Sequence, residues 1–307
     1  MSGGDGRGPL VDVAVPRKGR PLEAVLERMA QLAGTPAIAD EIISTLRYEK
    51  AIAKGETTPE ADVYTRLTEY STLEDETRPD FTLLRDDRDG MPRRIVFDSV
   101  TIPLETVTVR LIGREEPFRA LRKHEVALGF DSADLVLEEV VGLRPEPLTD
   151  LGEMNERIDP HDTDVRVVTG LGDTVYHTLL ATPAVAETVD VAALDREFVR
   201  AYDGDLCVSP RYERLVEAIL GTSALDGIRF AYPDEGQPEE AAIAETGLGV
   251  YLTVTGSTAR DHGLIVGEDL FASETALLEN VAETGADPID RVKAKLRGAD
   301  LETELLV

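Results

Sequence analysis

The hydrophobic pattern at the start of the chain predicts a strand, a basic loop and a helix, in that order. Residues 11–15 are apolar apart from one aspartate, which is typical of a short buried strand. Residues 16–21 form a basic loop containing proline and glycine. Apolar residues then recur at helical spacing from Leu22 to Leu32, and residues 38–53 continue as a second helix.

Strand and helix patterns alternate through the rest of the chain. Two apolar runs flank a turn-forming segment at 86–92 and predict a hairpin. The alternation predicts an α/β fold with largely parallel strands, followed by a charged helical tail after Leu277. Further predicted elements are strands at 107–112, 126–130, 165–168, 175–181, 228–232 and 249–254, helices at 115–123, 133–141 and 210–220, a polar surface stretch at 55–80 and a linker at 143–163.

The chain is strongly acidic and contains little lysine. Among its 307 residues, 60 acids oppose 32 bases, the formal charge is −28, and only six of the bases are lysines. High net charge keeps a protein soluble, and concentrated salt screens the repulsion that the charge causes. The composition indicates a surface adapted to a high-salt cytoplasm, with an ordinary acidic protein from an arginine-rich genome as the alternative. Both exclude a non-specific nucleic-acid surface, which needs clustered positive charge.

Length, cysteine content and hydropathy set further limits. A chain of 307 residues has room for roughly two domains. Its one cysteine, Cys207, cannot form an intrachain disulfide or a multi-cysteine zinc site. The N-terminus does not resemble a signal peptide, and no apolar run approaches the roughly 18 residues that span a bilayer. We therefore expect a cytoplasmic protein with no membrane partner.

The sharpest candidate site is a small-residue turn that follows an apolar strand. Thr255, Gly256, Ser257 and Thr258 come directly after the strand predicted at 249–254. Such a turn exposes consecutive backbone N–H groups, glycine allows a ligand to approach closely, and hydroxyls add donors. A helix that follows would add partial positive charge. The pattern is that of a phosphate cradle, although an ordinary turn has the same composition.

The second candidate site is the basic loop after the first strand. Arg17, Lys18, Gly19 and Arg20 place three cations in four residues of a very acidic chain. Open α/β sheets bind ligands at the carboxyl ends of their strands, and arginine and lysine suit phosphate or pyrophosphate. A solvated basic loop is the alternative interpretation.

No other residue pattern identifies a catalytic group or a metal. The four histidines are far apart in the sequence and lack the spacing of zinc ligands. The acidic residues around His161 are best interpreted as a solvated linker, and no GxSxG motif is present. Catalytic residues and metal ligands are therefore left unassigned.

Taken in order, these segments resemble the ATP phosphoribosyltransferase family of histidine biosynthesis, in its short form without the C-terminal regulatory domain. The resemblance covers roughly residues 11–33 and 107–282 and leaves 34–106 as an insertion. About 25 residues follow it, too few for a further domain. The segments that carry the resemblance are Val15–Arg20, Ala127–Asp134, Ala181–Pro183, Val208–Tyr212, Glu239 or Glu240 with Gly247–Leu248, Thr255–Leu264 and Ser273–Leu277.

The resemblance implies a bilobal α/β fold like that of type II periplasmic binding proteins, with a central cleft. Lobe one would comprise residues 1–164 and 265–307, including the insertion at 34–106. Lobe two would comprise 165–264 and carry the phosphate loop. The cleft would be lined by 16–20 from one lobe and 255–258 from the other, and we expect a homo-oligomer.

The reaction implied by the resemblance joins N1 of ATP to C1 of phosphoribosyl pyrophosphate and releases pyrophosphate, with Mg²⁺ as cofactor. Residues 255–258 would hold the 5′-phosphate, and Lys18 and Arg20 would neutralise pyrophosphate or nucleotide phosphates. Glu239 and Glu240 are possible substrate contacts. The ligand would be a nucleotide or a phosphoribosyl compound.

Three departures from the family pattern concern the substrate. Tyr251 replaces the aspartate that holds the ribose in the family, and Asp131 places an anion where the family has a Thr-Gly pair. The family's arginine could correspond to Arg110 or Arg114. These changes support an alternative, in which the chain is a non-catalytic paralogue that serves as a ligand sensor, regulatory subunit or assembly component.

Overall fold

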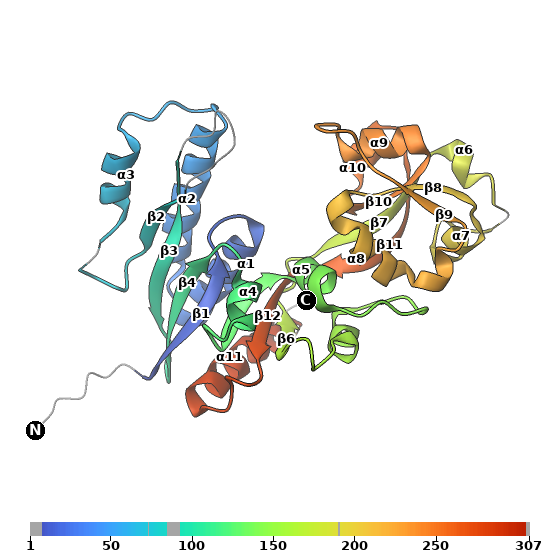
Figure 1. The fold of residues 1–307 in the computed structure, drawn as a ribbon. Helices are drawn as coiled ribbons and strands as arrows, with labels where there is room; N and C mark the ends of the chain where they lie inside the picture. Colours follow the sequence, from blue (N-terminus) through green and yellow to red (C-terminus); the bar gives the residue numbers. More distant parts are fainter. Residues whose placement is uncertain (1–7, 73, 85–92, 190, 305–307) are drawn as a thin grey trace, which may run out of the picture. The chain divides into compact units, whose positions relative to one another are not determined.

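The chain folds into two compact α/β units, each with its own mixed sheet (Figure 1). The computed structural model describes residues 8–72, 74–84, 93–189 and 191–304. Unit 1 comprises 1–131, 164–171 and 275–307, and unit 2 comprises 132–163 and 172–274. The predicted α/β class with two lobes is therefore confirmed. The turn expected at 86–92 lies outside the described residues.

Unit 1 is built on a seven-stranded sheet in the order β2-β3-β4-β1-β5-β12-β6. The central strand β1 runs parallel to β4 and β5, whereas β2, β3 and β4 are successively antiparallel, as are β12 and β6. Its strands are β1 (Leu10–Pro16), β2 (Asp80–Leu84), β3 (Arg94–Pro103), β4 (Thr108–Arg114), β5 (Leu128–Ser132), β6 (Val165–Gly170) and β12 (Thr275–Asn280), and its helices are α1 (Arg20–Ala33), α2 (Pro36–Ala53), α3 (Val63–Tyr70), α4 (Pro117–Arg122) and α11 (Asp287–Glu304).

Helix α1 forms where the apolar spacing predicts it. Leu22, Val25, Leu26 and Met29 are buried on one face and join the core of unit 1. Gly34 ends the helix in the left-handed conformation, with its N–H donating to the carbonyls of the last turn. The helix thus begins directly after the basic loop and holds that loop at the carboxyl end of β1.

Within the insertion at 34–106, two helices pack against the β2–β3 hairpin (Figure 1). A buried ion pair joins them, since the Arg66 guanidinium of α3 donates to both carboxylate oxygens of Glu49 of α2, at 2.7 and 3.0 Å. The Tyr70 hydroxyl donates to the same carboxylate at 3.1 Å. Burial and the Glu49 charge raise the pKa of Tyr70 to about 12.

Unit 2 is built on a five-stranded sheet in the order β11-β7-β10-β8-β9. Strand β7 is antiparallel to β10 and β11, and β8 is parallel to β10 and β9. Its strands are β7 (Val175–Ala181), β8 (Gly204–Cys207), β9 (Ile228–Ala231), β10 (Leu248–Thr253) and β11 (Ile265–Ser273), its α-helices are α5 (Ala133–Val140), α6 (Pro183–Ala186), α7 (Arg196–Ala201), α8 (Glu213–Leu220), α9 (Glu239–Thr246) and α10 (Ser257–Asp261), and short 3₁₀ helices occur at Leu151–Arg157, Pro210–Tyr212 and Thr222–Ala224.

The observed strand pairing differs from the expected strand directions and from the expected start of the C-terminal helix. The expectation of largely parallel strands was wrong. Besides β2–β3, whose antiparallel pairing was predicted, the pairs β3–β4, β7–β10, β7–β11 and β6–β12 are also antiparallel. The helical tail expected after Leu277 begins only at Asp287, since Thr275–Asn280 forms β12 in the unit 1 sheet.

The same pairing moves the boundaries of the two lobes. Residues 265–274 were expected in lobe one, but β11 pairs with β7 along its length and belongs to unit 2. Residues 165–171 were expected in lobe two, but β6 pairs with β12 in unit 1. Residues 132–163 belong to unit 2, where α5 packs on α8.

Candidate functional site

The phosphate loop predicted at 255–258 connects β10 to α10 in unit 2 (Figure 1). Gly256 has a φ of +65° and is the residue immediately before the helix. A Cβ at this position would lie 2.8 Å from the Val266 side chain, so both backbone conformation and space require glycine. The sharp turn therefore depends on this residue.

Hydrogen bonds within the loop fix its shape. The Arg260 guanidinium donates to the Thr255 carbonyl at 2.6 Å, and the Ser257 N–H donates to the Thr255 hydroxyl at 3.4 Å. In the described part of the chain, no acceptor faces the backbone N–H of Gly256 or Thr258. The loop thus presents N–H donors and hydroxyls with a cation beside them, a combination suited to an oxyanion. The contribution of Arg260 was not predicted, although it lies only five residues after Thr255.

A hollow of about 260 Å³ lies against this loop and is lined by Glu240, Tyr251, Thr253 and residues 254–259. Glu239 and Glu240, in the first turn of α9, lie near the Tyr251 phenol. Burial raises the pKa of the Tyr251 phenol, and the charges of Glu239 and Glu240 raise it further. The phenol therefore remains a hydrogen-bond donor at neutral pH. The predicted residues Tyr251, Glu239 and Glu240 thus gather beside the loop.

A hydroxyl network supports the strand that enters the loop. The hydroxyls of Thr178 and Thr253 are 2.6 Å apart, and Thr178 also donates to Asp269 at 2.7 Å. Thr178 is fully buried on β7, next to Tyr251 in the cross-strand register. The network fixes Thr253 in the wall of the hollow. Sequence analysis did not identify it, because its members are 75 and 91 residues apart.

A buried histidine and carboxylate lie elsewhere in the same unit. His177 Nε2 is 3.2 Å from Asp134 Oδ2, a close contact without the geometry of a hydrogen bond. The Tyr212 ring meets the His177 ring edge to face, with centroids 5.3 Å apart. Burial raises the pKa of Tyr212 despite the Arg211 guanidinium beside it. The wide sequence separation of these residues hid the cluster from sequence analysis.

The basic loop belongs to unit 1, and its cations have different roles. Arg17 is anchored, since its Nε donates to the Gly113 carbonyl at 3.2 Å and its guanidinium lies 3.5 Å from Asp98. Lys18 is exposed, Gly19 has a φ of +88°, and Arg20 is the first residue of α1. Lys18 and Arg20 remain the candidates for contacts with phosphates, whereas Arg17 holds the loop to β4.

The two arginines that could correspond to the family's arginine have different surroundings in the structure. Arg110 forms a two-bond ion pair with Asp12 on β1, at 2.8 and 2.7 Å. Arg114 is paired with Pro16 at the carboxyl ends of β4 and β1, beside the basic loop. Arg114 also lines a hollow of about 240 Å³ together with Arg119, Lys123 and three glutamates, and its Nε lies 3.8 Å from Glu125. Its position makes Arg114 the better candidate for a ligand contact.

Asp131 is a structural residue in this fold. Its side chain is buried and accepts a hydrogen bond from the Phe118 N–H in the first turn of α4. First-turn N–H groups of a helix have no intrahelical acceptor, so this carboxylate supplies one. The anion that stands in place of the family's Thr-Gly pair is thus bonded within the protein.

Across the described residues, no group of three or more His, Cys, Asp or Glu side chains is arranged to hold a metal ion. Glu239 and Glu240 provide two carboxylates near the phosphate loop. Magnesium is commonly held by one or two carboxylates together with substrate phosphates and water. The residues present fit an ion that arrives with a phosphorylated substrate rather than a resident metal.

The sequence matches the family model described as halobacterial ATP phosphoribosyltransferase over residues 8–307. The chain belongs to this family. The match extends through residues 34–106, so the segment interpreted as an insertion is part of what the halobacterial family model describes. The comparison with curated proteins returns no match.

Solved structures with some similarity include an ATP phosphoribosyltransferase complex. The HisG:HisZ complex of ATP phosphoribosyl transferase from Thermotoga maritima has 12% identity and a TM-score of 0.42, with 94% of this chain and 97% of that chain covered. YhfZ from Shigella flexneri has 9% identity and a TM-score of 0.41, with 94% and 84% covered. The regulatory domain of the LysR family regulator MetR from N. meningitidis has 13% identity and a TM-score of 0.33, with 62% and 80% covered.

The two departures from the family pattern, at Tyr251 and Asp131, lie in different places in the structure. Tyr251 lines the hollow beside the phosphate loop, whereas Asp131 is bonded to α4. Only Tyr251 therefore alters the candidate site.

Among the described residues, no helix is both long and apolar enough to cross a membrane.

Proposed function

We propose that the protein transfers the phosphoribosyl group of phosphoribosyl pyrophosphate to N1 of ATP and releases pyrophosphate. The observation that carries this proposal is the turn at 255–258, where Gly256 exposes backbone N–H donors and Arg260 adds a cation. Family membership supplies the reaction class. Such a site acts by positioning the substrates and stabilising charge, without covalent chemistry on the protein.

The 5′-phosphate would bind at the loop. The N–H groups of Gly256 and Thr258 and the hydroxyls of Ser257 and Thr258 are the available donors, whereas the Thr255 hydroxyl donates to Ser257 at 3.1 Å. Gly256 is needed for this turn because a Cβ there would lie 2.8 Å from the Val266 side chain. Arg260, held against the Thr255 carbonyl, would balance the phosphate charge.

The ribose would lie in the hollow beside the loop. Carboxylate oxygens accept hydrogen bonds from sugar hydroxyls, and Glu240 lines this hollow. Tyr251 occupies the position of the family's aspartate, and Glu239 and Glu240 lie near its hydroxyl. We therefore assign the acceptor role for the sugar to Glu239 and Glu240.

Lys18 and Arg20, with Arg114, would neutralise the pyrophosphate or the phosphates of ATP. Magnesium, bound with the phosphorylated substrate, would supply further charge neutralisation; Glu239 and Glu240 are the carboxylates that could contact it. We further propose that the reaction is cytoplasmic and that the working form is a homo-oligomer, which sedimentation in molar KCl tests.

The second candidate is a non-catalytic paralogue that binds a phosphoribosyl or nucleotide ligand as a sensor, subunit or assembly component. The half-buried Tyr251 ring beside the phosphate loop favours it, because the family has a small acidic residue there. Both candidates use the same loop, so loop binding alone does not separate them.

Pyrophosphate release separates the two. The full-length protein is incubated in molar KCl with phosphoribosyl pyrophosphate, ATP and Mg²⁺, and pyrophosphate is measured by a coupled assay. The transferase requires release that depends on both substrates. Binding of phosphoribosyl pyrophosphate by calorimetry without any release would instead establish the non-catalytic protein.

A further inference from the structure

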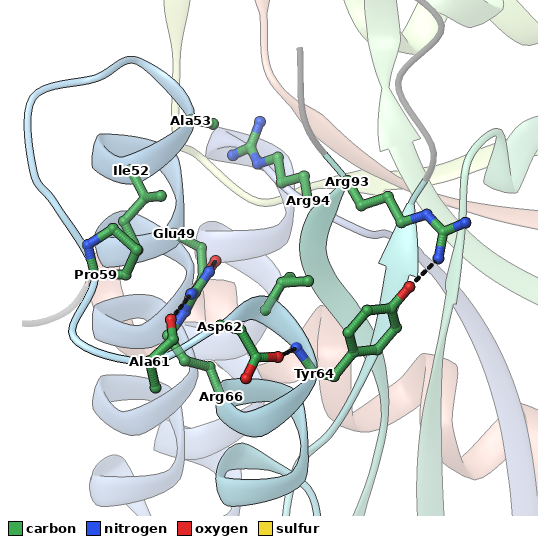
Figure 2. Close-up of a pocket in the computed structure, with 11 residues that line it drawn as sticks. Glu49, Ile52, Ala53, Pro59, Ala61, Asp62, Tyr64, Arg66, Arg93 and Arg94 are labelled. Atoms are coloured by element: carbon green, nitrogen blue, oxygen red, sulfur yellow. Dashed lines mark hydrogen bonds and ion pairs between the residues drawn. The ribbon is translucent and has the colours of Figure 1, made fainter.

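A second cavity lies in unit 1, within residues 34–106, and shares no residue with the phosphate loop or the basic loop. It has a volume of about 410 Å³ and is bounded by the end of α2, the segment before α3, the start of α3 and the start of β3 (Figure 2). Cavities of about 300–1,000 Å³ are typical of small-molecule sites. Its size is thus suited to a molecule with one or two rings.

The charges in the wall between the two helices are already paired. Arg66 forms two hydrogen bonds with Glu49, and its remaining nitrogen donates to the Ala61 carbonyl at 2.6 Å. Asp62 caps α3 by accepting from the N–H groups of Tyr64 and Thr65. Figure 2 shows Glu49 and Arg66 meeting between α2 and α3. Neither carboxylate is therefore available to a cationic ligand.

Apolar side chains make up most of the remaining wall. Ile52 and Ala53 come from the last turn of α2, Pro59 from the connecting segment and Val63 from the start of α3. Tyr64 follows at the mouth and is 56% exposed. A flat apolar molecule would bury its faces against these groups, since aromatic rings and aliphatic side chains pack well together.

The mouth of the cavity carries positive charge. The Arg93 guanidinium donates to the Tyr64 hydroxyl and lies 5.9 Å from the centre of the Tyr64 ring (Figure 2). No carboxylate of the described residues pairs with Arg93. Of the described residues in the lining, Arg66, Arg93 and Arg94 are basic and Glu49 and Asp62 are acidic. A net positive lining is unusual in a chain of net charge −28.

We propose that this cavity binds a small aromatic acid, with its ring against Ile52, Pro59 and Val63 and its acidic group at Arg93. The apolar wall accounts for the ring, and the arginine without a carboxylate partner accounts for the acid. The site is independent of the proposed transferase reaction, because none of its residues belongs to the candidate substrate site.

The test uses 2-naphthoate as the probe and 2-naphthamide as its uncharged counterpart. The chain has no tryptophan, so naphthyl fluorescence and anisotropy can be followed with little protein background. In buffered KCl, the wild-type protein is expected to bind naphthoate at least about tenfold more tightly than naphthamide, the difference of one charge-assisted hydrogen bond.

Two variants locate the binding. Arg93→Gln is expected to weaken naphthoate about tenfold and to leave naphthamide nearly unchanged. Ala53→Phe fills the cavity and is expected to abolish binding of both probes. If Ala53→Phe does not fold, as judged by circular dichroism, Ala61→Leu provides the second filling variant. Arg78→Gln is the matched control, because Arg78 is an exposed arginine of unit 1 outside this cavity.

Three results would overturn the proposal. The first is no naphthoate binding by the wild-type protein up to the solubility limit of the probe. The second is equal affinity for naphthoate and naphthamide, which would mean that the acidic group does not contribute to binding. The third is unchanged naphthoate binding in Arg93→Gln and in a folded filling variant, which places the probe elsewhere.

Discussion

Oδ2 of Asp131 accepts a hydrogen bond from the backbone N–H of Phe118, with 3.0 Å between oxygen and nitrogen. The two residues are 13 positions apart, and both are buried in unit 1. The bond ties the end of β5 to the first turn of α4. It explains how an acid can replace the family's Thr-Gly pair without facing a phosphate.

Asp131→Ala is therefore expected to lower stability and leave ligand binding intact. The buried Phe118 N–H would lose its acceptor, at a cost of about 1–3 kcal/mol. Chemical denaturation in molar KCl measures the loss, and calorimetry measures phosphoribosyl pyrophosphate affinity. Asp159→Ala is the control, since Asp159 accepts an equivalent bond from the His161 N–H at an exposed position. A large loss of affinity in folded Asp131→Ala would contradict the structural role.

Gly256→Val should abolish binding of phosphoribosyl pyrophosphate while the protein remains folded. Valine is strained at a φ of +65°, and its Cβ would lie 2.8 Å from Val266, so the turn has to rearrange. The strain costs about 1–3 kcal/mol, and calorimetry reads the affinity. Gly263→Ala is the control, with a φ of +73° and no atom within 4 Å of the added Cβ. If Gly256→Val binds phosphoribosyl pyrophosphate as tightly as the wild type, residues 255–258 are an ordinary turn and not a phosphate site.

Tyr251→Asp distinguishes the two candidate functions. In a working transferase the variant adds a carboxylate beside Glu239 and Glu240, and the repulsion should lower affinity for phosphoribosyl pyrophosphate about tenfold or more. Tyr251→Phe, which loses only the hydroxyl, should have a smaller effect. Tyr232→Asp is the control, because Tyr232 is an exposed tyrosine outside the hollow whose hydroxyl donates to a glutamate, Glu213. Improved binding in Tyr251→Asp would support the non-catalytic paralogue.

Glu49→Ala is expected to destabilise unit 1 strongly. Removing one partner of a buried ion pair leaves a buried charge uncompensated, which typically costs about 3–5 kcal/mol. Arg66 is only 8% exposed in its side chain, so water cannot replace the lost carboxylate easily. Glu41→Ala breaks the exposed pair with Arg78 and should cost about 1 kcal/mol or less. Equal effects of the two variants, measured by denaturant unfolding, would mean that the buried pair is solvated.

The melting temperature should rise steadily with KCl between about 0.1 and 3 M. The Debye length falls from about 10 Å at 0.1 M to about 3 Å at 1 M, so carboxylates repel less across the surface. The chain's charge of −28 makes this repulsion large. Differential scanning calorimetry over the KCl series gives the curve. A flat response would reject adaptation to high salt.

Local patterns in the sequence determined the parts of this protein that depend on neighbouring residues. The strand and the glycine turn around 255–258 were predicted because strand patterns and turn residues act over a few positions, whereas the helix that follows was considered only as a condition. The helix after the basic loop followed in the same way from apolar residues at helical spacing. The family resemblance rested on these local motifs, and the family match bears it out.

Contacts between distant residues were decided only by the tertiary structure. Arg17 is anchored to Gly113, 96 residues away, and Arg110 is paired with Asp12, 98 residues away. From the sequence, each of these arginines was an equal candidate for a ligand contact. The charge of an arginine does not tell which carboxylate or carbonyl of the protein will bind it. Strand order likewise placed β11 in unit 2, because its backbone groups pair with β7 rather than with neighbours in sequence. Spacing along the chain predicts local conformation, but packing selects which side chains remain available to a ligand.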